Sequence, residues 1–160
     1  MIKKKLLKEL WNKSSYYYKE GRRSTLDRFG KSPATLKIMN YCANARKVLD
    51  CGCGDGTMME LIAHQNMQII GIDISQIALK IGKNRVKRNN IHFVCGDIER
   101  LPFKNNVFDC VYSAWVLEHL VAPERIVDEM VRVTNIGGYI IFVSPNYGSP
   151  LYMPRSSLTQ

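Results

Sequence analysis

The chain has 160 residues, of which 46% are hydrophobic and 23% charged, a balance that is ordinary for one globular domain with a buried core. No apolar run approaches the ~20 residues of a membrane-spanning helix, and the lysine-rich N-terminus lacks the continuous apolar segment of a signal peptide. With a formal net charge of +9, the sequence therefore predicts a basic, cytoplasmic protein without a membrane span.

The positive charge is concentrated near the N-terminus. Residues 1–47 hold 13 Lys and Arg against three acidic residues, whereas residues 48–160 hold 10 against 11. Such a basic arm can contact an anionic substrate, a membrane surface or nucleic acid, or it can form a solvated helix face. The charge distribution leaves these alternatives open.

Five cysteines are present, an odd number at irregular spacing that does not fit a disulfide framework. Cys51 and Cys53 have no second Cys or His pair at zinc-finger spacing. We therefore interpret the cysteines as reduced thiols and predict no metal site.

In chain order, the first expected elements are helices. Residues 2–11 place apolar side chains at helical spacing with lysines between them, which predicts an amphipathic helix. Ser32 followed by Pro33 is typical of a second helix start, running to about Cys42. We expect residues 1–45 to form a basic helical cap.

From residue 46 the pattern changes to short apolar segments separated by helical ones. Strands are predicted over residues 46–50, 68–73, 91–97, 108–115 and 139–144. Helices are predicted over about 57–65, from a Ser75 cap to about 87, and from Pro123 to about 133, where Asn135 and the Gly137-Gly138 pair end the last one. This alternation predicts an α/β fold, a parallel sheet with helices on both faces. Residues 147–160, with few apolar side chains, are expected to be irregular.

In sheets of this kind, ligands bind outside the carboxyl ends of the strands. Four expected strands end at or near a polar residue on this rim: Asp50, Asp73, Asp97 and Ser113. We therefore expect these residues to share one site.

The first strand runs into a glycine-rich loop, "VLDCGCGDG", residues 48–56. Its spacing is G-x-G-x-G, which differs from the G-x-G-x-x-G of dinucleotide-binding loops. A pyrophosphate needs backbone N–H groups free of nearby negative charge, whereas Asp50 and Asp55 bracket this loop. At ~4 Å and an effective dielectric of about 20, one like-charge contact costs about 4 kcal/mol. The loop therefore favours a cation over a phosphate.

Two more acids suggest the rest of the ligand. Asp73 ends the second strand, and its two acceptor oxygens can bind both hydroxyls of a ribose. Asp97 ends the third strand, within reach of an adenine amino group. The candidate ligand is an adenosine whose 5′ end is positively charged and carries no phosphate, and S-adenosylmethionine fits.

Five segments then carry a family resemblance: "VLDCGCGDG", "GIDIS", "GDIERLPF", "FDCVYSAWVLEHL" and "RVTNIGGYIIFVSPN". In order and spacing they resemble the successive motifs of class I S-adenosylmethionine-dependent methyltransferases, and most closely the small-molecule branch that includes quinone-biosynthesis enzymes. The resemblance implies a Rossmann-like core over residues 46–146, with five strands in the order 3-2-1-4-5.

The resemblance also implies roles for single residues. Those at the methionine end of the cofactor would be Asp50, Gly52, Gly54, Ser113 and Ala114. Asp73 would bind the ribose hydroxyls and Asp97 the adenine amino group, with Ile74 and Ile98 beside the adenine. Tyr18 is a further candidate for closing over the cofactor, with a packing role as the alternative.

Methyl transfer from a sulfonium is an in-line displacement, so positioning supplies much of the rate, and a general base assists acceptors that must lose a proton. His119, in "LEHL", is the candidate base by resemblance, and a structural histidine is the alternative. Metal-binding methyltransferases have Glu-x-x-Glu-His at this point. Here Trp115 replaces the first Glu, which supports the prediction of no metal.

Members of the family continue after the fifth strand with elements that the 16 residues after Ser144 are too few to supply. We therefore expect an incomplete domain. Residues 139–144 are apolar and uncharged, so this edge strand is expected either to pair with a second copy or to be covered by a longer polypeptide.

The predicted function is a methyltransferase that uses S-adenosylmethionine and acts on a small-molecule acceptor through oxygen, carbon or nitrogen. One alternative is a cofactor-binding module or fragment without catalysis of its own. Another is a nucleic-acid methyltransferase that uses the basic arm.

Overall fold

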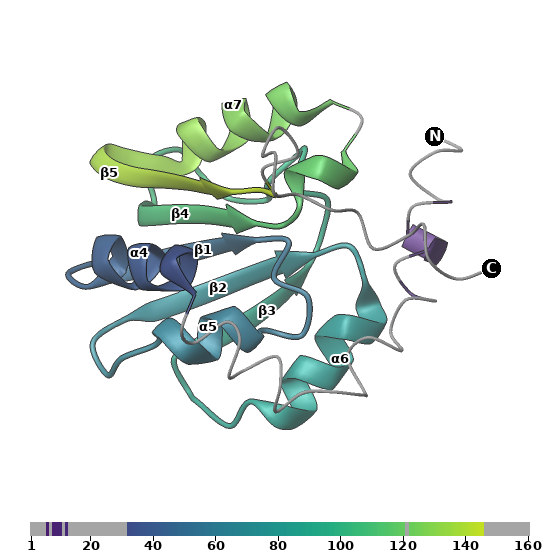
Figure 1. Ribbon diagram of the computed structural model, residues 1–160, viewed down its shortest axis with the longest axis horizontal. Helices are drawn as coiled ribbons and strands as arrows, with labels where there is room; N and C mark the ends of the chain where they lie inside the picture. Colours follow the sequence, from purple (N-terminus) through teal and green to yellow (C-terminus); the bar gives the residue numbers. More distant parts are fainter. Residues whose placement is uncertain (1–5, 7, 11, 13–31, 121, 146–160) are drawn as a thin grey trace.

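The computed structural model describes residues 6, 8–10, 12, 32–120 and 122–145, so Tyr18, the tail 147–160 and most of the expected N-terminal cap lie outside the described residues. The described residues form one parallel sheet in the order β3-β2-β1-β4-β5, as predicted (Figure 1). Its strands are β1 (Lys47–Cys51), β2 (Gln68–Asp73), β3 (Ile91–Cys95), β4 (Phe108–Ala114) and β5 (Thr134–Val143).

Helices cover both faces of the sheet, which confirms the predicted fold class. The elements are α4 (Pro33–Cys42), α5 (Thr57–Ile62), α6 (Gln76–Arg85), the short 3-10 helix η1 (Leu117–His119) and α7 (Pro123–Val133). One buried core joins the sheet to α4, α5 and α6, and a second joins it to α7. Among the described residues, no helix has both the length and the apolar character needed to cross a membrane.

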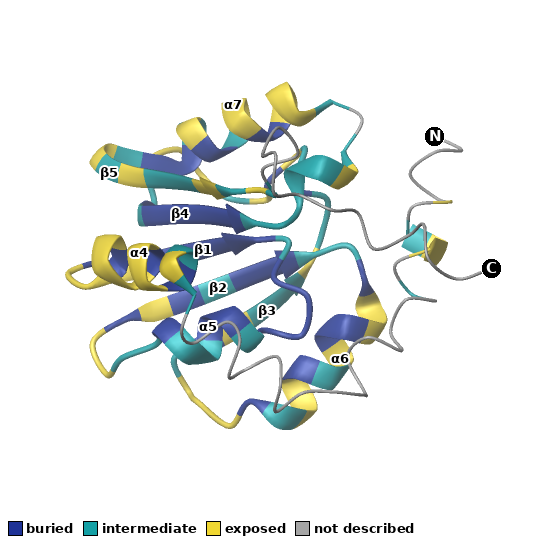
Figure 2. Ribbon diagram, in the orientation of Figure 1, coloured by how far each residue is buried: buried dark blue, intermediate teal, exposed yellow. Residues whose placement is uncertain are grey.

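The central strands are buried on both faces, because neighbouring side chains of a strand point to opposite sides of the sheet. Val48 and Leu49 are both fully buried, yet Val48 belongs to the core under α4 and Leu49 to the core under α7. Figure 2 shows this burial along β1, β2 and β4. These strands therefore hold their carboxyl ends in fixed positions.

The predicted helix starts are confirmed by their caps. The Ser32 hydroxyl accepts a hydrogen bond from the Thr35 backbone N–H at 3.1 Å, and the Ser75 hydroxyl accepts one from the Ala78 N–H at 3.3 Å. Pro123 occupies the first turn of α7. The helix after Ser75 ends at Arg85, two residues earlier than expected.

The fifth strand begins earlier than the sequence pattern predicted. β5 starts at Thr134, directly after α7, because Thr134 pairs with Phe108 while Tyr139 pairs with Cys110. Residues 135–138 therefore bulge opposite Asp109, and the Asn135 side-chain amide donates to the Asp109 carboxylate at 2.8 Å. The expected helix stop over residues 135–138 is thus a bulge within the strand.

The outer edge of β5 has no strand beside it among the described residues, because β5 pairs only with β4. β5 carries the exposed apolar residues Ile136, Tyr139 and Phe142, and Figure 2 shows exposed positions along this strand. The Tyr139 ring also packs against the Tyr41 ring of α4, with ring centroids 5.1 Å apart and ring planes tilted by 52°.

Replacing Gly82 by alanine should destabilise the chain, although alanine is normally favoured over glycine inside a helix by about 1 kcal/mol. A Cβ at Gly82, which is buried in α6, would lie 2.6 Å from the Asp55 carbonyl oxygen and 2.7 Å from the Phe93 ring. We expect a loss of about 1–3 kcal/mol in the free energy of unfolding in urea. The control Lys83→Ala, an exposed position on the same helix, should change it by less than about 0.5 kcal/mol. A Gly82→Ala chain more stable than the wild type would show that α6 does not pack this closely.

Candidate functional site

The glycine loop between β1 and α5 depends on a backbone conformation that favours glycine. Gly52, Gly54 and Gly56 all have positive φ angles, of 86°, 55° and 76°. The loop is tied to β2, since the N–H groups of Gly52 and Cys53 both donate to the Ile72 carbonyl oxygen, at 2.8 and 3.2 Å. The loop therefore lies at the carboxyl ends of β1 and β2, as predicted.

The loop also touches the segment that follows β4. A Cβ at Gly52 would lie 2.4 Å from a methyl group of Val116, so only glycine allows this approach. Trp115, just before Val116, has a φ of 57°, a conformation that is rare for a bulky side chain. Its backbone N–H donates to the Val143 carbonyl oxygen at 2.7 Å. The segment is thus held between the glycine loop and β5.

Asp73, at the end of β2, holds the glycine loop with its carboxylate. One oxygen accepts the Gly54 N–H at 2.8 Å, and the other accepts the Ser75 N–H at 2.7 Å. Burial raises the pKa of Asp73, and the backbone N–H groups partly oppose this effect. Because each carboxylate oxygen has a second lone pair, both can still accept hydroxyl groups.

Asp50, near the end of β1, is almost completely buried. The Tyr112 hydroxyl of β4 donates to one of its oxygens at 2.8 Å. Burial raises the pKa of Asp50 to about 7, the Tyr112 hydrogen bond lowers it, and the nearby Asp73 carboxylate raises it. No salt bridge among the described residues reaches Asp50 or Asp73.

The expectation that Asp55 presents a second free carboxylate to the loop's ligand is wrong. The Asp55 carboxylate accepts hydrogen bonds from the Thr57 N–H at 3.1 Å and the Thr57 hydroxyl at 2.7 Å. It also lies 3.4 Å from the Arg85 guanidinium, which forms a second salt bridge with Glu60. Asp55 therefore caps α5 and is neutralised by Arg85, which leaves Asp50 and Asp73 as the carboxylates of the loop.

The third strand contributes Asp97 and Ile98 just beyond its end. One Asp97 side-chain oxygen accepts the Glu99 N–H at 3.0 Å, which forms a tight turn after β3. Ile98 is buried in the core under α7. Ile74, after β2, is half-buried.

The fourth strand contributes Ser113 and Ala114. Ser113 is fully buried, and its hydroxyl donates to the Cys51 carbonyl oxygen at 2.9 Å, which links β4 to β1. Ala114 is half-buried and packs against the core under α4. Both residues thus lie on the rim beside the glycine loop.

His119, the candidate base, is exposed in η1, a few residues beyond Ala114. The neighbouring Glu118 has a side-chain oxygen that is buried without a hydrogen-bond partner. Within the described ranges, no three His, Cys, Asp or Glu side chains gather in a way that could hold a metal ion.

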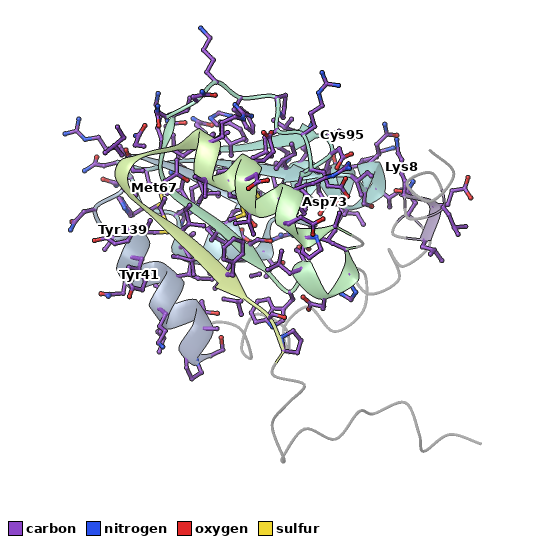
Figure 3. The ribbon with its side chains drawn as sticks, turned by 90° about the horizontal axis from the view of Figure 1, so that it is seen from above. Lys8, Tyr41, Met67, Asp73, Cys95 and Tyr139 are labelled. Atoms are coloured by element: carbon purple, nitrogen blue, oxygen red, sulfur yellow. The ribbon has the colours of Figure 1, made fainter. Side chains whose placement is uncertain are left out.

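The N-terminal segment reaches this rim through one described contact. The Ser75 hydroxyl donates to the Asn12 side-chain oxygen at 3.1 Å. In Figure 3, Asp73 lies at the same end of the molecule as Lys8, whereas Tyr41 and Tyr139 lie at the other. Asn12 therefore lies close to the end of β2 that carries Asp73.

The sequence analysis did not identify two residues of the site, Tyr112 and Arg85. Tyr112 bonds Asp50 because β1 and β4 are neighbours with Asp50 opposite Tyr112, and Arg85 reaches Asp55 from the far end of α6. Strand order could have indicated the first, since residues 108–115 were expected beside residues 46–50. No local pattern indicated the second.

Comparison with known families gives one match over most of this region. Residues 49–142 match the family model described as "Methyltransferase domain". The match begins in β1 and ends in β5, so it contains all five strands and every described site residue.

Curated relatives agree with this match. Demethylmenaquinone methyltransferase of Renibacterium salmoninarum is 37% identical over 106 residues, covering 64% of this chain and 44% of that protein. Ubiquinone biosynthesis O-methyltransferase of Coxiella burnetii is 30% identical over 126 residues, covering 76% of this chain and 54% of that protein. The chain thus spans about half the length of the curated relatives it matches.

Solved structures share the fold. The PH0226 protein of Pyrococcus horikoshii superimposes with a TM-score of 0.68 at 25% identity, covering 81% of this chain and 57% of that one. The sheet order, the ordered motifs and the family match agree with one another, and the predicted resemblance is confirmed. This chain belongs to the methyltransferase domain family.

Proposed function

We propose that this chain binds S-adenosylmethionine and belongs to an enzyme that transfers the methyl group to a small-molecule acceptor. One observation carries the proposal: the buried carboxylate of Asp50 and the half-buried carboxylate of Asp73 lie at the glycine loop, and neither forms a salt bridge among the described residues. The family match and the names of the relatives support it. We also propose a cytoplasmic location, supported by five cysteines that are all free thiols.

The residues present fit this cofactor. Its ammonium and sulfonium groups are cations, which suits a loop lined by carboxylates and without a free phosphate site. Its ribose offers two hydroxyls to Asp73, whose oxygens each keep an acceptor position. When bound, the cofactor supplies an activated methyl group on sulfur.

The chain's own residues would bind and orient the cofactor. We propose that Asp50, Gly52 and Gly54 contact its methionine end, together with Ser113 and Ala114, whose strand lies beside β1. Asp97, with Ile74 and Ile98, is proposed for the adenine. Because Ile98 is buried in the core under α7, we propose that it supports the residues around the adenine and does not contact the adenine directly.

A unit that binds the cofactor but needs further chain for catalysis is the second candidate. It is favoured by the fact that this chain spans about half the length of its curated relatives. Incubation with S-adenosylmethionine and a demethylated quinone separates the two. Release of S-adenosylhomocysteine supports catalysis by the chain, and binding without release supports the second candidate.

Asp73→Ala should weaken the binding of S-adenosylhomocysteine by about 1.5–3 kcal/mol, because hydrogen bonds to a charged acceptor are lost. Isothermal titration calorimetry on the 160-residue chain measures this. The control Asp128→Ala, an exposed acid of α7, should leave the affinity unchanged. An unchanged affinity in a folded Asp73→Ala chain would remove Asp73 from the site, and tight NAD binding without S-adenosylhomocysteine binding would contradict the proposed cofactor.

We propose His119 as the general base for an acceptor that must lose a proton. His119→Ala should then lower kcat by about 100-fold or more, the range for general base catalysis, with the S-adenosylhomocysteine affinity within about twofold of wild type. The control His92→Ala, an exposed histidine of β3 that contacts Gln68, should change neither quantity. Loss of both affinity and thermal stability in His119→Ala would assign a structural role instead.

Pairing of two copies through residues 139–144 is a further proposal, supported by the unpartnered edge of β5 and its exposed apolar side chains. Light scattering should show a concentration-dependent dimer, and Phe142→Lys should abolish it, since a charge on an edge strand opposes pairing. Val131→Lys, on the exposed side of α7, is the control and should leave the dimer intact. A wild-type chain that stays monomeric at high concentration would contradict this pairing.

A further inference from the structure

Tyr112 and Asp50 form a buried, hydrogen-bonded pair inside the sheet. The two residues lie opposite each other on β4 and β1, and the Tyr112 hydroxyl donates to the Asp50 carboxylate at 2.8 Å. Tyr112 has no exposed surface, and Asp50 has only 3%. Water therefore contributes little to the solvation of this carboxylate, and Tyr112 is the donor among the described side chains that satisfies it.

Besides the Tyr112 hydroxyl, the titratable groups that interact with Asp50 among the described residues are one acid and three thiols. Asp73 comes from the end of β2, Cys51 from β1 itself, Cys53 from the glycine loop and Cys42 from α4. Burial raises the pKa values of Cys51 and Cys53, so these thiols are neutral. No lysine or arginine among the described residues forms a salt bridge with Asp50.

In this environment, the protonated and ionised forms of Asp50 have similar free energies at neutral pH. Burial raises its pKa to about 7, against ~3.9 for an unperturbed aspartate, while the Tyr112 hydrogen bond acts in the opposite direction. The pKa of Asp50 is higher in the folded chain than in the unfolded chain, so the protonated form of Asp50 stabilises the cofactor-free fold. This contribution to the free energy of unfolding is complete below pH ~4 and is lost as the pH rises through about 7.

We propose that Tyr112 is a positioning residue that holds the Asp50 carboxylate in its ionised form for the cationic end of the cofactor, and that this pair makes cofactor affinity rise with pH near neutrality. The proposal rests on the proposed function. It adds a residue that the family match does not assign and a pH dependence that follows from this chain's buried tyrosine.

The direction and size of the effect follow from the fraction of Asp50 that is ionised. An apparent dissociation constant increases as the binding-competent fraction decreases. With a midpoint of about 7, the ionised fraction, and with it the affinity, should increase about tenfold between pH 6 and pH 8. Above about pH 8 the affinity should level off.

The test is calorimetric binding of S-adenosylhomocysteine to the 160-residue chain from about pH 6 to about pH 9, for the wild type and for Tyr112→Phe. Because the hydroxyl lowers the pKa of Asp50, its removal should shift the affinity rise to higher pH. The variant should bind several-fold more weakly at pH 7 and approach wild-type affinity at pH 9. Tyr139→Phe, an exposed tyrosine on β5, is the matched control and should reproduce the wild-type profile.

A second measurement does not depend on any variant. 5′-Methylthioadenosine keeps the adenine and ribose but lacks the ammonium group, so its affinity should not follow the ionisation of Asp50. Asp50→Asn should likewise flatten the profile of S-adenosylhomocysteine, with weaker binding at pH 8.

These outcomes separate the inference from the function on which it rests. If S-adenosylhomocysteine does not bind at any pH, the proposed function fails. If it binds with an affinity that is flat from pH 6 to pH 8, or if methylthioadenosine shows the same rise, the inference is wrong while the function stands. Thermal unfolding of each variant shows whether it is folded, and a folded Tyr112→Phe with an unshifted profile also overturns the inference.

Discussion

The structure of the site depends on two carboxylates, the buried Asp50 and the half-buried Asp73, that form no salt bridge within the described part of the chain. Asp73 accepts hydrogen bonds from the N–H groups of Gly54 and Ser75, and Asp50 accepts one from the Tyr112 hydroxyl. Burial raises the pKa of both groups, which shows that the fold disfavours their charged forms. Asp55 is different, because Arg85 lies beside it. Among the described residues, Asp50 and Asp73 thus lack the guanidinium partner that Asp55 has, and the proposed cationic ligand would lower the cost of placing their charges at the glycine loop.

The sheet and its helices hold these carboxylates together. In the parallel register, Asp50 lies opposite Gly71 of β2 on one side and Tyr112 of β4 on the other. A Cβ at Gly71 would lie 2.5 Å from the Met59 sulfur of α5, so glycine lets α5 pack directly under the loop. The glycine loop after β1 is therefore held by the packing of α5 against β2 and by the hydrogen bond from the Gly54 N–H to Asp73.

The parts of this structure that local chemistry determines could be predicted from the sequence. The Ser32 and Ser75 caps, the strand order and the positions of Asp50 and Asp73 at the rim all follow from short patterns or from the family's ordered motifs. The bulge in β5 could not be predicted, because it depends on which residue of β4 each residue of β5 meets. The Arg85–Asp55 pair could not be predicted either, since it joins residues that are far apart in sequence.

One fold can support different chemical functions, which depend on the residues of the site. Two relatives of this chain carry different names, a demethylmenaquinone methyltransferase that is 37% identical to it and a ubiquinone biosynthesis O-methyltransferase that is 30% identical. Among the described residues, the segment after β4 connects two proposed roles, cofactor binding and proton removal from the acceptor. Val116 lies against Gly52 of the glycine loop, and the backbone N–H of the exposed His119 donates to the Val116 carbonyl oxygen at 2.9 Å, so one short segment joins the proposed cofactor loop to the candidate base.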